Sequence, residues 1–121
     1  MGVDLKAVQA LDLWRGAIVE SVRREAPDLS ARQMALLLTV YLTAPPHTVR
    51  GLATALNISK PAITRALDRL SEYGLIRRKV DETDRRSVLI QRTVKGSVFL
   101  REFGDIIVGA AAETPTLDAR R

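Results

Sequence analysis

The residues best suited to bind another molecule are cations that gather in the middle of this sequence. Of the 19 Lys and Arg residues, 11 lie between His47 and Gly96, with 5 of the 14 acidic residues. Arg outnumbers Lys by 15 to 4, and its planar guanidinium can contact a phosphate or a guanine edge through two hydrogen bonds. The pattern indicates a polyanionic partner, although a solvated basic surface would carry the same charges.

Other kinds of chemistry lack the residues that they need. The chain has no Cys and one His, which excludes disulfides and thiolate metal sites and argues against a His-cluster metal site. We find no Gly-rich phosphate loop, no Ser/His/Asp or Cys/His set, and no ligands at metal spacing. The sequence therefore predicts a protein that is not an enzyme and that has no cofactor or metal.

Length and hydropathy fit one modest globular domain. The chain has 121 residues, of which 46% are hydrophobic, enough to fill one core. No apolar run approaches the roughly 20 residues that a membrane helix needs, and residues 1–10 lack the basic start and apolar stretch of a signal peptide. A soluble, cytoplasmic protein without membrane contact is the expectation.

Apolar residues at spacings of three and four predict five helices. The expected spans are 4–25, 31–43, 48–56, 60–73 and 94–112. Ser30 and Gln33 form a capping-box pattern before the second helix. Ser59 can cap the fourth helix, Pro61 fits its first turn, and Gly74 fits its end.

A strand-like pattern follows the fourth helix. Strands at 75–80 and 87–91, with a polar turn at 81–86, predict a β-hairpin. Residues 113–121 have little to bury and are expected to form a mobile tail. The whole pattern predicts one domain over 1–112, with a core at about 30–92 and the helices 4–25 and 94–112 at its ends.

Two helices around a short turn, followed by a basic hairpin, are typical of a winged helix-turn-helix that places its second helix in the DNA major groove. The outward face of the helix 60–73 holds Lys60, Thr64, Arg65, Asp68 and Arg69, opposite Ile63, Ala66, Leu67 and Leu70. We expect Arg65 to read bases, Thr64 to touch a base edge or a thymine methyl, and Lys60 and Arg69 to hold phosphates. Asp68 and Glu72 are expected to pair with Arg65, Arg69 or Lys79.

The hairpin turn supplies a second candidate contact. Arg85 and Arg86 lie where a wing would reach the minor groove, whose narrow A·T-rich form attracts inserted Arg. Asp84 would repel phosphate, so its useful role is to orient a neighbouring guanidinium by an ion pair. A charged turn that serves only solubility is the alternative.

The segments SKPAITRALDRL and GLIRR, with Asp84 and Arg86 of the turn, resemble the MarR family of bacterial transcription regulators. The resemblance implies a mainly α fold with a small β-hairpin wing (α+β), with N- and C-terminal dimerisation helices. It further implies a homodimer that binds a pseudo-palindromic operator in double-stranded DNA, usually as a repressor, and an effector pocket for a small molecule. The expected DNA-binding residues are Ser59, Lys60, Pro61, Thr64, Arg65 and Arg69 of the recognition helix, and Asp84, Arg85 and Arg86 of the wing.

The sequence leaves open what the apolar faces of the two terminal helices pack against. The apolar faces from Leu5 to Val22 and from Val98 to Ile107 could pack on a partner or within one monomer core. The aromatic residues Trp14, Tyr41, Phe99 and Phe103 are expected in the core rather than in an effector pocket.

The alternative function is a winged-helix protein–protein interaction module that does not bind specific DNA.

Overall fold

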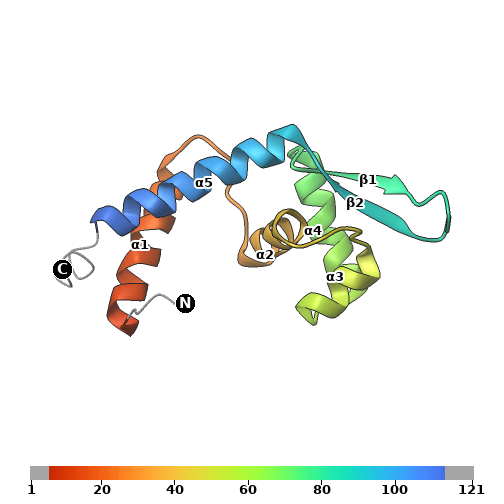
Figure 1. Ribbon diagram of the computed structural model, residues 1–121, viewed down its shortest axis with the longest axis horizontal. Coiled ribbons are helices and arrows are strands. Elements are labelled where there is room, and N and C mark those ends of the chain that lie inside the picture. The colour runs from red at the N-terminus through yellow and green to blue at the C-terminus, as the bar shows by residue number, and fades with distance from the viewer. Residues whose placement is uncertain (1–5, 114–121) are drawn as a thin grey trace. The chain divides into compact units, whose positions relative to one another are not determined.

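The computed structural model describes residues 6–113 (Figure 1). In chain order the elements are α1 (Ala7–Arg23), α2 (Ala31–Leu42), α3 (Val49–Leu56), α4 (Lys60–Glu72), β1 (Ile76–Val80), β2 (Val88–Arg92) and α5 (Val94–Glu113). They divide into two compact units. The central unit is Leu29–Leu100, and the terminal unit comprises the residues up to Asp28 and those from Arg101.

The core of the central unit is built around one face of α4, which contacts α2, α3 and β1. The buried side chains of α4 are Ala62, Ile63, Ala66, Leu67 and Leu70. They recur at helical spacing and form one apolar stripe, as the sequence predicts. Leu36, Leu37 and Val40 of α2 and Leu52 of α3 belong to the same core.

Helix ends lie close to the predicted boundaries because local caps set them. The Ser30 hydroxyl accepts a hydrogen bond from the Gln33 backbone N–H, and the Gln33 side chain accepts one from the Ser30 N–H, which confirms the capping box. Ser59 caps α4 by accepting from the Ala62 N–H. Gly74 follows α4 with a φ of +75°, a conformation that favours glycine.

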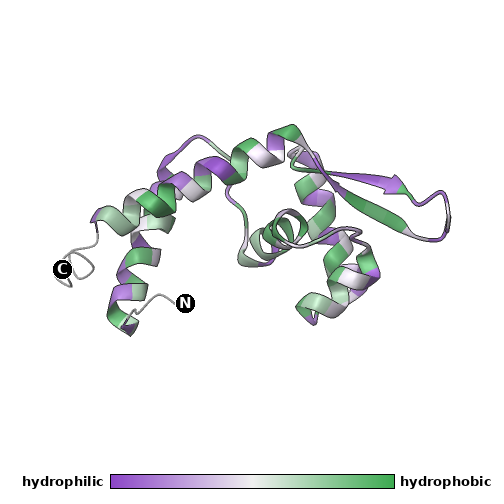
Figure 2. Ribbon diagram, viewed as in Figure 1, coloured by the Kyte–Doolittle hydropathy of each residue, from purple (hydrophilic) through white to green (hydrophobic). Residues whose placement is uncertain are grey.

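The hairpin is antiparallel, and its register runs from Ile76 opposite Arg92 to Val80 opposite Val88. β2 lies one residue later than predicted. Its other edge pairs with the chain before α3, where the Ile90 N–H donates to the His47 carbonyl at 2.8 Å. β2 is therefore bordered on both edges, and Figure 2 shows it largely hydrophobic beside a largely hydrophilic β1. Cationic side chains on the outer strand oppose pairing with another chain.

A polar network joins α2 to both ends of the hairpin. The Tyr41 hydroxyl donates to the Leu75 carbonyl at 2.6 Å and accepts from the Thr93 N–H at 2.9 Å. The Thr93 hydroxyl donates to the Gly74 carbonyl and accepts from the Gly96 N–H. A Cβ at Gly96 would overlap the Tyr41 hydroxyl and the Leu75 carbonyl oxygen. Only glycine therefore fits where α5 starts against this network.

In the terminal unit, α1 meets the C-terminal part of α5. The Trp14 and Phe103 rings pack edge to face, with their centroids 6.3 Å apart, and Gly16 allows a close approach to Ala110. Phe103 is buried, as is Phe99 of the central unit, which confirms both as core residues, whereas Trp14 is 50% exposed and the core prediction for it is wrong. No helix in the described part of the chain combines the length and hydropathy needed to cross a bilayer.

The predicted apolar stripe of α1 is exposed on this chain. Val8, Leu11 and Val22 expose more than 60% of their surface. α1 ends at Arg23 rather than at residue 25, and its predicted start at residue 4, like most of the predicted tail at 113–121, lies outside the described residues. A single chain thus leaves this stripe without a core to enter.

Replacing Tyr41 with Phe should lower the free energy of unfolding by about 1–3 kcal/mol, because the Thr93 N–H and the Leu75 carbonyl lose their partner. Chemical denaturation followed by circular dichroism measures this loss. Tyr73→Phe is the matched control, since the Tyr73 hydroxyl has no hydrogen bond among the described residues. Equal losses in the two variants would contradict the role of the network.

Candidate nucleic-acid interface

The recognition-helix residues predicted from the sequence share one exposed surface. Ser59, Lys60, Pro61, Thr64, Arg65 and Arg69 are all exposed, as is Asp68 among them. They lie opposite the buried stripe because α4 is packed from one side only. The sequence therefore folds into a helix whose outward face carries hydroxyl and guanidinium groups in a fixed orientation.

Two arginines of this region are held by carboxylates. Arg69 pairs with Glu72 at 3.3 Å and lies over the Tyr73 ring, which confirms the predicted pairing of Glu72. Asp68 pairs with Arg78 of β1 at 2.6 Å, a residue that the prediction for Asp68 did not include. The Asp68–Arg78 pair joins partners ten positions apart and ties α4 to the hairpin.

Lys60 and Arg65, unlike Arg69 and Arg78, are not held by a carboxylate of the described residues. Within the described residues neither side chain makes an ion pair or a hydrogen bond. Because Asp68 turns to Arg78 and Glu72 to Arg69, no carboxylate of α4 holds Arg65. Its guanidinium keeps all five N–H donors available.

The wing turn contains the ion pair that the sequence predicts. The Arg86 Nε donates to Asp84 Oδ1 at 3.3 Å, and the Arg86 backbone N–H donates to the same oxygen at 3.2 Å. The Arg86 side chain is still 93% exposed, so the carboxylate orients the guanidinium without covering it. Arg85, beside it, is exposed and has no partner among the described residues.

Asp81 also shapes the turn, a role that the sequence analysis missed. Thr83 donates to Asp81 Oδ1 from its hydroxyl at 2.7 Å and from its backbone N–H at 3.0 Å. The hydroxyl bond is the larger cause that lowers the pKa of Asp81 below its ordinary value of 3.8, and the backbone bond adds to it. The sequence signal is an Asp two residues before a Thr in a turn, the usual spacing for such a local bond.

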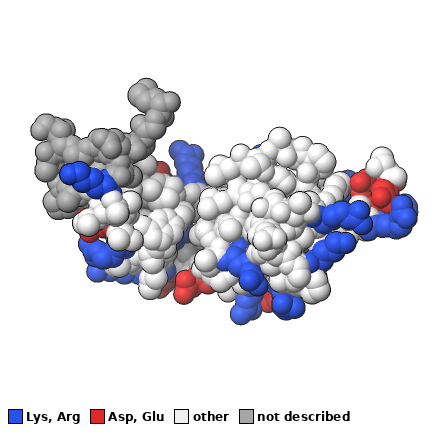
Figure 3. Space-filling model, turned by 90° about the horizontal axis from the view of Figure 1, so that it is seen from below, with Lys and Arg blue, Asp and Glu red and all other residues white. Residues whose placement is uncertain are grey.

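A hollow of about 520 Å³ lies where the wing meets the helices of the central unit. Its lining residues are Thr48, Val49, Arg50, Lys60, Asp84, Arg86, Ser87 and Val88. It thus brings Lys60 of α4 together with Asp84 and Arg86 of the wing, and it adds Arg50, which the sequence analysis left unassigned. Figure 3 shows Lys and Arg along the hairpin, with acidic side chains among them at its tip.

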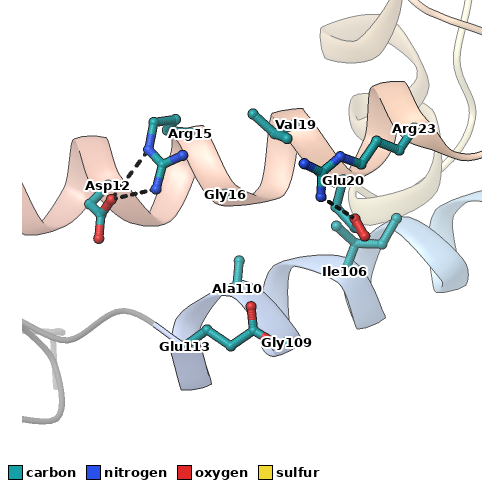
Figure 4. A pocket seen from close by; sticks show the side chains of 10 residues that line it. All are labelled: Asp12, Arg15, Gly16, Val19, Glu20, Arg23, Ile106, Gly109, Ala110 and Glu113. Atoms are coloured by element: carbon teal, nitrogen blue, oxygen red, sulfur yellow. Dashed lines mark hydrogen bonds and ion pairs between the residues drawn. The ribbon is translucent and has the colours of Figure 1, made fainter.

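The terminal unit has a hollow of about 500 Å³ between α1 and α5 (Figure 4). Its cations are paired along α1, Arg15 with Asp12 at 3.0 Å and Arg23 with Glu20 at 3.7 Å. None of Trp14, Tyr41, Phe99 and Phe103 lines it. Because its cations are paired with carboxylates and no aromatic residue lines it, we assign no effector to this hollow.

Comparison with known proteins shows which family has this fold. The model of the MarR family matches residues 29–88. Through this segment, the chain belongs to the MarR family.

Solved structures show the same winged helix-turn-helix fold. A crystal structure of MarR has a TM-score of 0.63 and 24% identity, over 85% of this chain and 71% of that chain. A Staphylococcus aureus MepR mutant bound to an oligodeoxyribonucleotide has a TM-score of 0.72 and 24% identity, over 84% and 72%. Reduced AbfR bound to DNA has a TM-score of 0.64 and 20% identity, over 84% and 70%. The predicted fold class, mainly helical with a small hairpin wing, is confirmed.

The pKa of Asp81 gives a test of the turn. Its carboxyl should titrate below 3.8, so that the turn is intact at neutral pH and loosens only as the pH falls through that lowered value. In Thr83→Val, which removes the hydroxyl donor but keeps the backbone N–H, the midpoint should rise part of the way toward 3.8. Carbon-detected NMR titration of the side-chain carboxyl measures both midpoints. An unchanged Asp81 midpoint in Thr83→Val would refute the assigned cause.

Proposed function

We propose that this MarR-family chain is a transcription regulator that binds double-stranded DNA through α4 and the hairpin wing. The observation that carries the proposal is the exposed face of α4, where Lys60 and Arg65 are held by no carboxylate of the described chain. An unpaired guanidinium on a helix that fits the major groove is suited to bidentate contact with a guanine edge. No catalytic step is part of this function.

The proposed contacts divide into two kinds. Arg65 and Thr64 read base edges, while Lys60, Arg69 and the Ser59 end of α4, with Pro61 in its first turn, lie against the backbone and set the register. Arg86, oriented by Asp84, enters the adjacent minor groove with Arg85 beside it. That MepR and AbfR have been solved with DNA supports duplex DNA as the partner.

A homodimer on a pseudo-palindromic operator is the proposed assembly, and repression by blocking the operator is the proposed outcome in the bacterial cytoplasm. The exposed apolar stripe of α1, with Leu11 69% and Val8 70% exposed, supports burial against a second copy. A dimer places two recognition helices about 34 Å apart, in successive turns of one face of the duplex.

A winged-helix module that binds an acidic protein surface is the alternative of another class. Both functions use the basic face, but only DNA binding supplies counterion release along a duplex. A fluorescence titration with random duplex DNA over a salt series separates them. Absence of binding at low salt would favour the protein-interaction module.

The division of labour on α4 is tested by two substitutions. Arg65→Ala should reduce the preference for the selected operator over random DNA by roughly 5- to 150-fold for every protomer bound, since a bidentate base contact is worth about 1–3 kcal/mol. Lys60→Ala should weaken binding to both duplexes by the same factor, because a phosphate contact carries no sequence information. The operator is first selected from a random pool, and both affinities are then measured by fluorescence anisotropy. A wild-type specificity ratio in Arg65→Ala would refute its role in base readout.

The dimer is tested by a charge on the apolar stripe. The wild-type chain should sediment at twice its 13.4 kDa mass, whereas Leu11→Glu should shift it toward the monomer, because a buried unpaired carboxylate is costly. Leu42→Glu is the matched control, since Leu42 of the central unit is 76% exposed and lies outside the proposed interface. A monomeric wild-type chain at micromolar concentration would contradict the assembly.

A further inference from the structure

Two hollows of the central unit border α4, and cations line both of them. The first, described above, lies on the wing side and includes Arg50 and Lys60 together with the Asp84–Arg86 ion pair. The second, of about 210 Å³, lies between α4 and the start of α2. Its lining residues are Ser30, Arg32, Gln33, Ala62, Arg65 and Ala66.

The two hollows lie on opposite borders of the exposed face of α4. At about 100° per residue, Ala62 is roughly 200° around the helix from Lys60. Ala66 and Arg65 fall on the same side as Ala62, whereas Lys60 borders the other side. The residues expected to enter the major groove therefore lie between two basic recesses.

Of the five cations that line the two hollows, only Arg86 is held by a carboxylate of the described chain. Arg32, Arg50, Lys60 and Arg65 make no ion pair or hydrogen bond with any residue that the structure describes. By contrast Arg69, Arg78 and Arg86 are each held by a carboxylate. The polar neighbours are engaged elsewhere, since Ser30 and Gln33 cap each other and Thr48 accepts from the Gly51 N–H.

We propose that the two hollows each seat a backbone phosphate, one on each of the two DNA strands that border the major groove. Arg50, with Lys60, holds the strand on the wing side, and Arg32 holds the opposite strand beside Arg65. A major groove about 12 Å wide and a helix about 10–12 Å in diameter with its side chains bring both flanks of α4 against the two backbones. The inference rests on the proposed function and adds Arg32 and Arg50 to the interface.

The first experiment measures how binding of the full chain to a selected operator duplex depends on salt. Each phosphate contact contributes about 0.9 to the slope of log K against log salt. Arg50→Gln and Arg32→Gln should each lower the slope by about 0.9 for every protomer bound, and Arg50→Lys should restore most of it. Lys95→Gln is the matched control, because Lys95 is exposed and unpaired among the described residues but lines neither hollow. Circular dichroism checks that every variant is folded.

The second experiment assigns the strands. Single methylphosphonate linkages, which are uncharged, replace phosphates one at a time along each strand of the same duplex. The wild-type chain should lose affinity when certain phosphates on either strand are replaced. Arg50→Gln should lose no further affinity at these positions on one strand, and Arg32→Gln should lose none at these positions on the other strand. If both variants lost their response to methylphosphonate on the same strand, the proposal would be overturned.

The outcomes also separate this inference from the function on which it rests. A wild-type chain that binds no duplex would refute the proposed function itself. A wild-type chain that binds the operator, with slopes for Arg32→Gln and Arg50→Gln equal to that of Lys95→Gln, would refute the two phosphate seats alone. Inorganic phosphate and chloride at equal ionic strength should compete equally if the seats require a backbone; stronger competition by phosphate would indicate a free-anion site instead.

Discussion

The apolar stripe of α4 packs into the angle between α2 and α3, and this packing fixes the rotation of α4 about its own axis. Ile63, Leu67 and Leu70 are fully buried, and burying such a side chain contributes about 1.5–3 kcal/mol. A shift of the helix by one residue would turn it by about 100° and bring Thr64 or Asp68 into the core. The direction in which Arg65 points is therefore set by residues that never touch a ligand.

The wing is positioned by a combination of strong and weak interactions. Leu75, Ile76 and Ile90 are buried at its base, and the hydrogen bonds of Tyr41 hold the backbone where the hairpin enters and leaves. The Asp68–Arg78 pair is half exposed, and such pairs contribute only about 0.5 kcal/mol. The pair thus contributes little to the stability of the fold.

Local patterns allow much of this architecture to be predicted from the sequence. The helices follow from apolar spacing, and the capping box at Ser30 follows from two side chains three residues apart. β2 differs by one residue because its pairing with β1 runs from Val88 to Arg92, and no local pattern encodes the bond that its other edge makes to His47. The partner of Asp68 could not be predicted for the same reason, since Arg78 approaches it only after the hairpin folds back.

A similar limit applies to surfaces. Periodicity shows that α1 has an apolar face, but it does not say what covers that face, and the described chain leaves it exposed. The two recesses beside α4 are assembled from α2, α3, α4 and the wing, so Arg32 and Arg50 resemble ordinary surface cations in the sequence. Only the geometry distinguishes a basic residue in a recess from one on an open surface.

The pairing of the charges gives a reason for the acidic residues in a basic region. Asp68, Glu72 and Asp84 each hold one arginine. Each such pair cancels one positive charge and so weakens the attraction of this region for a polyanion. Long side chains lose about 2 kcal/mol of rotamer entropy when fixed, so an arginine restrained before binding loses less of it on contact. The wing, where Arg86 is 93% exposed, needs that restraint most. Arg32 and Arg50 beside α4 have no such carboxylate among the described residues, so their full charge is available to a phosphate.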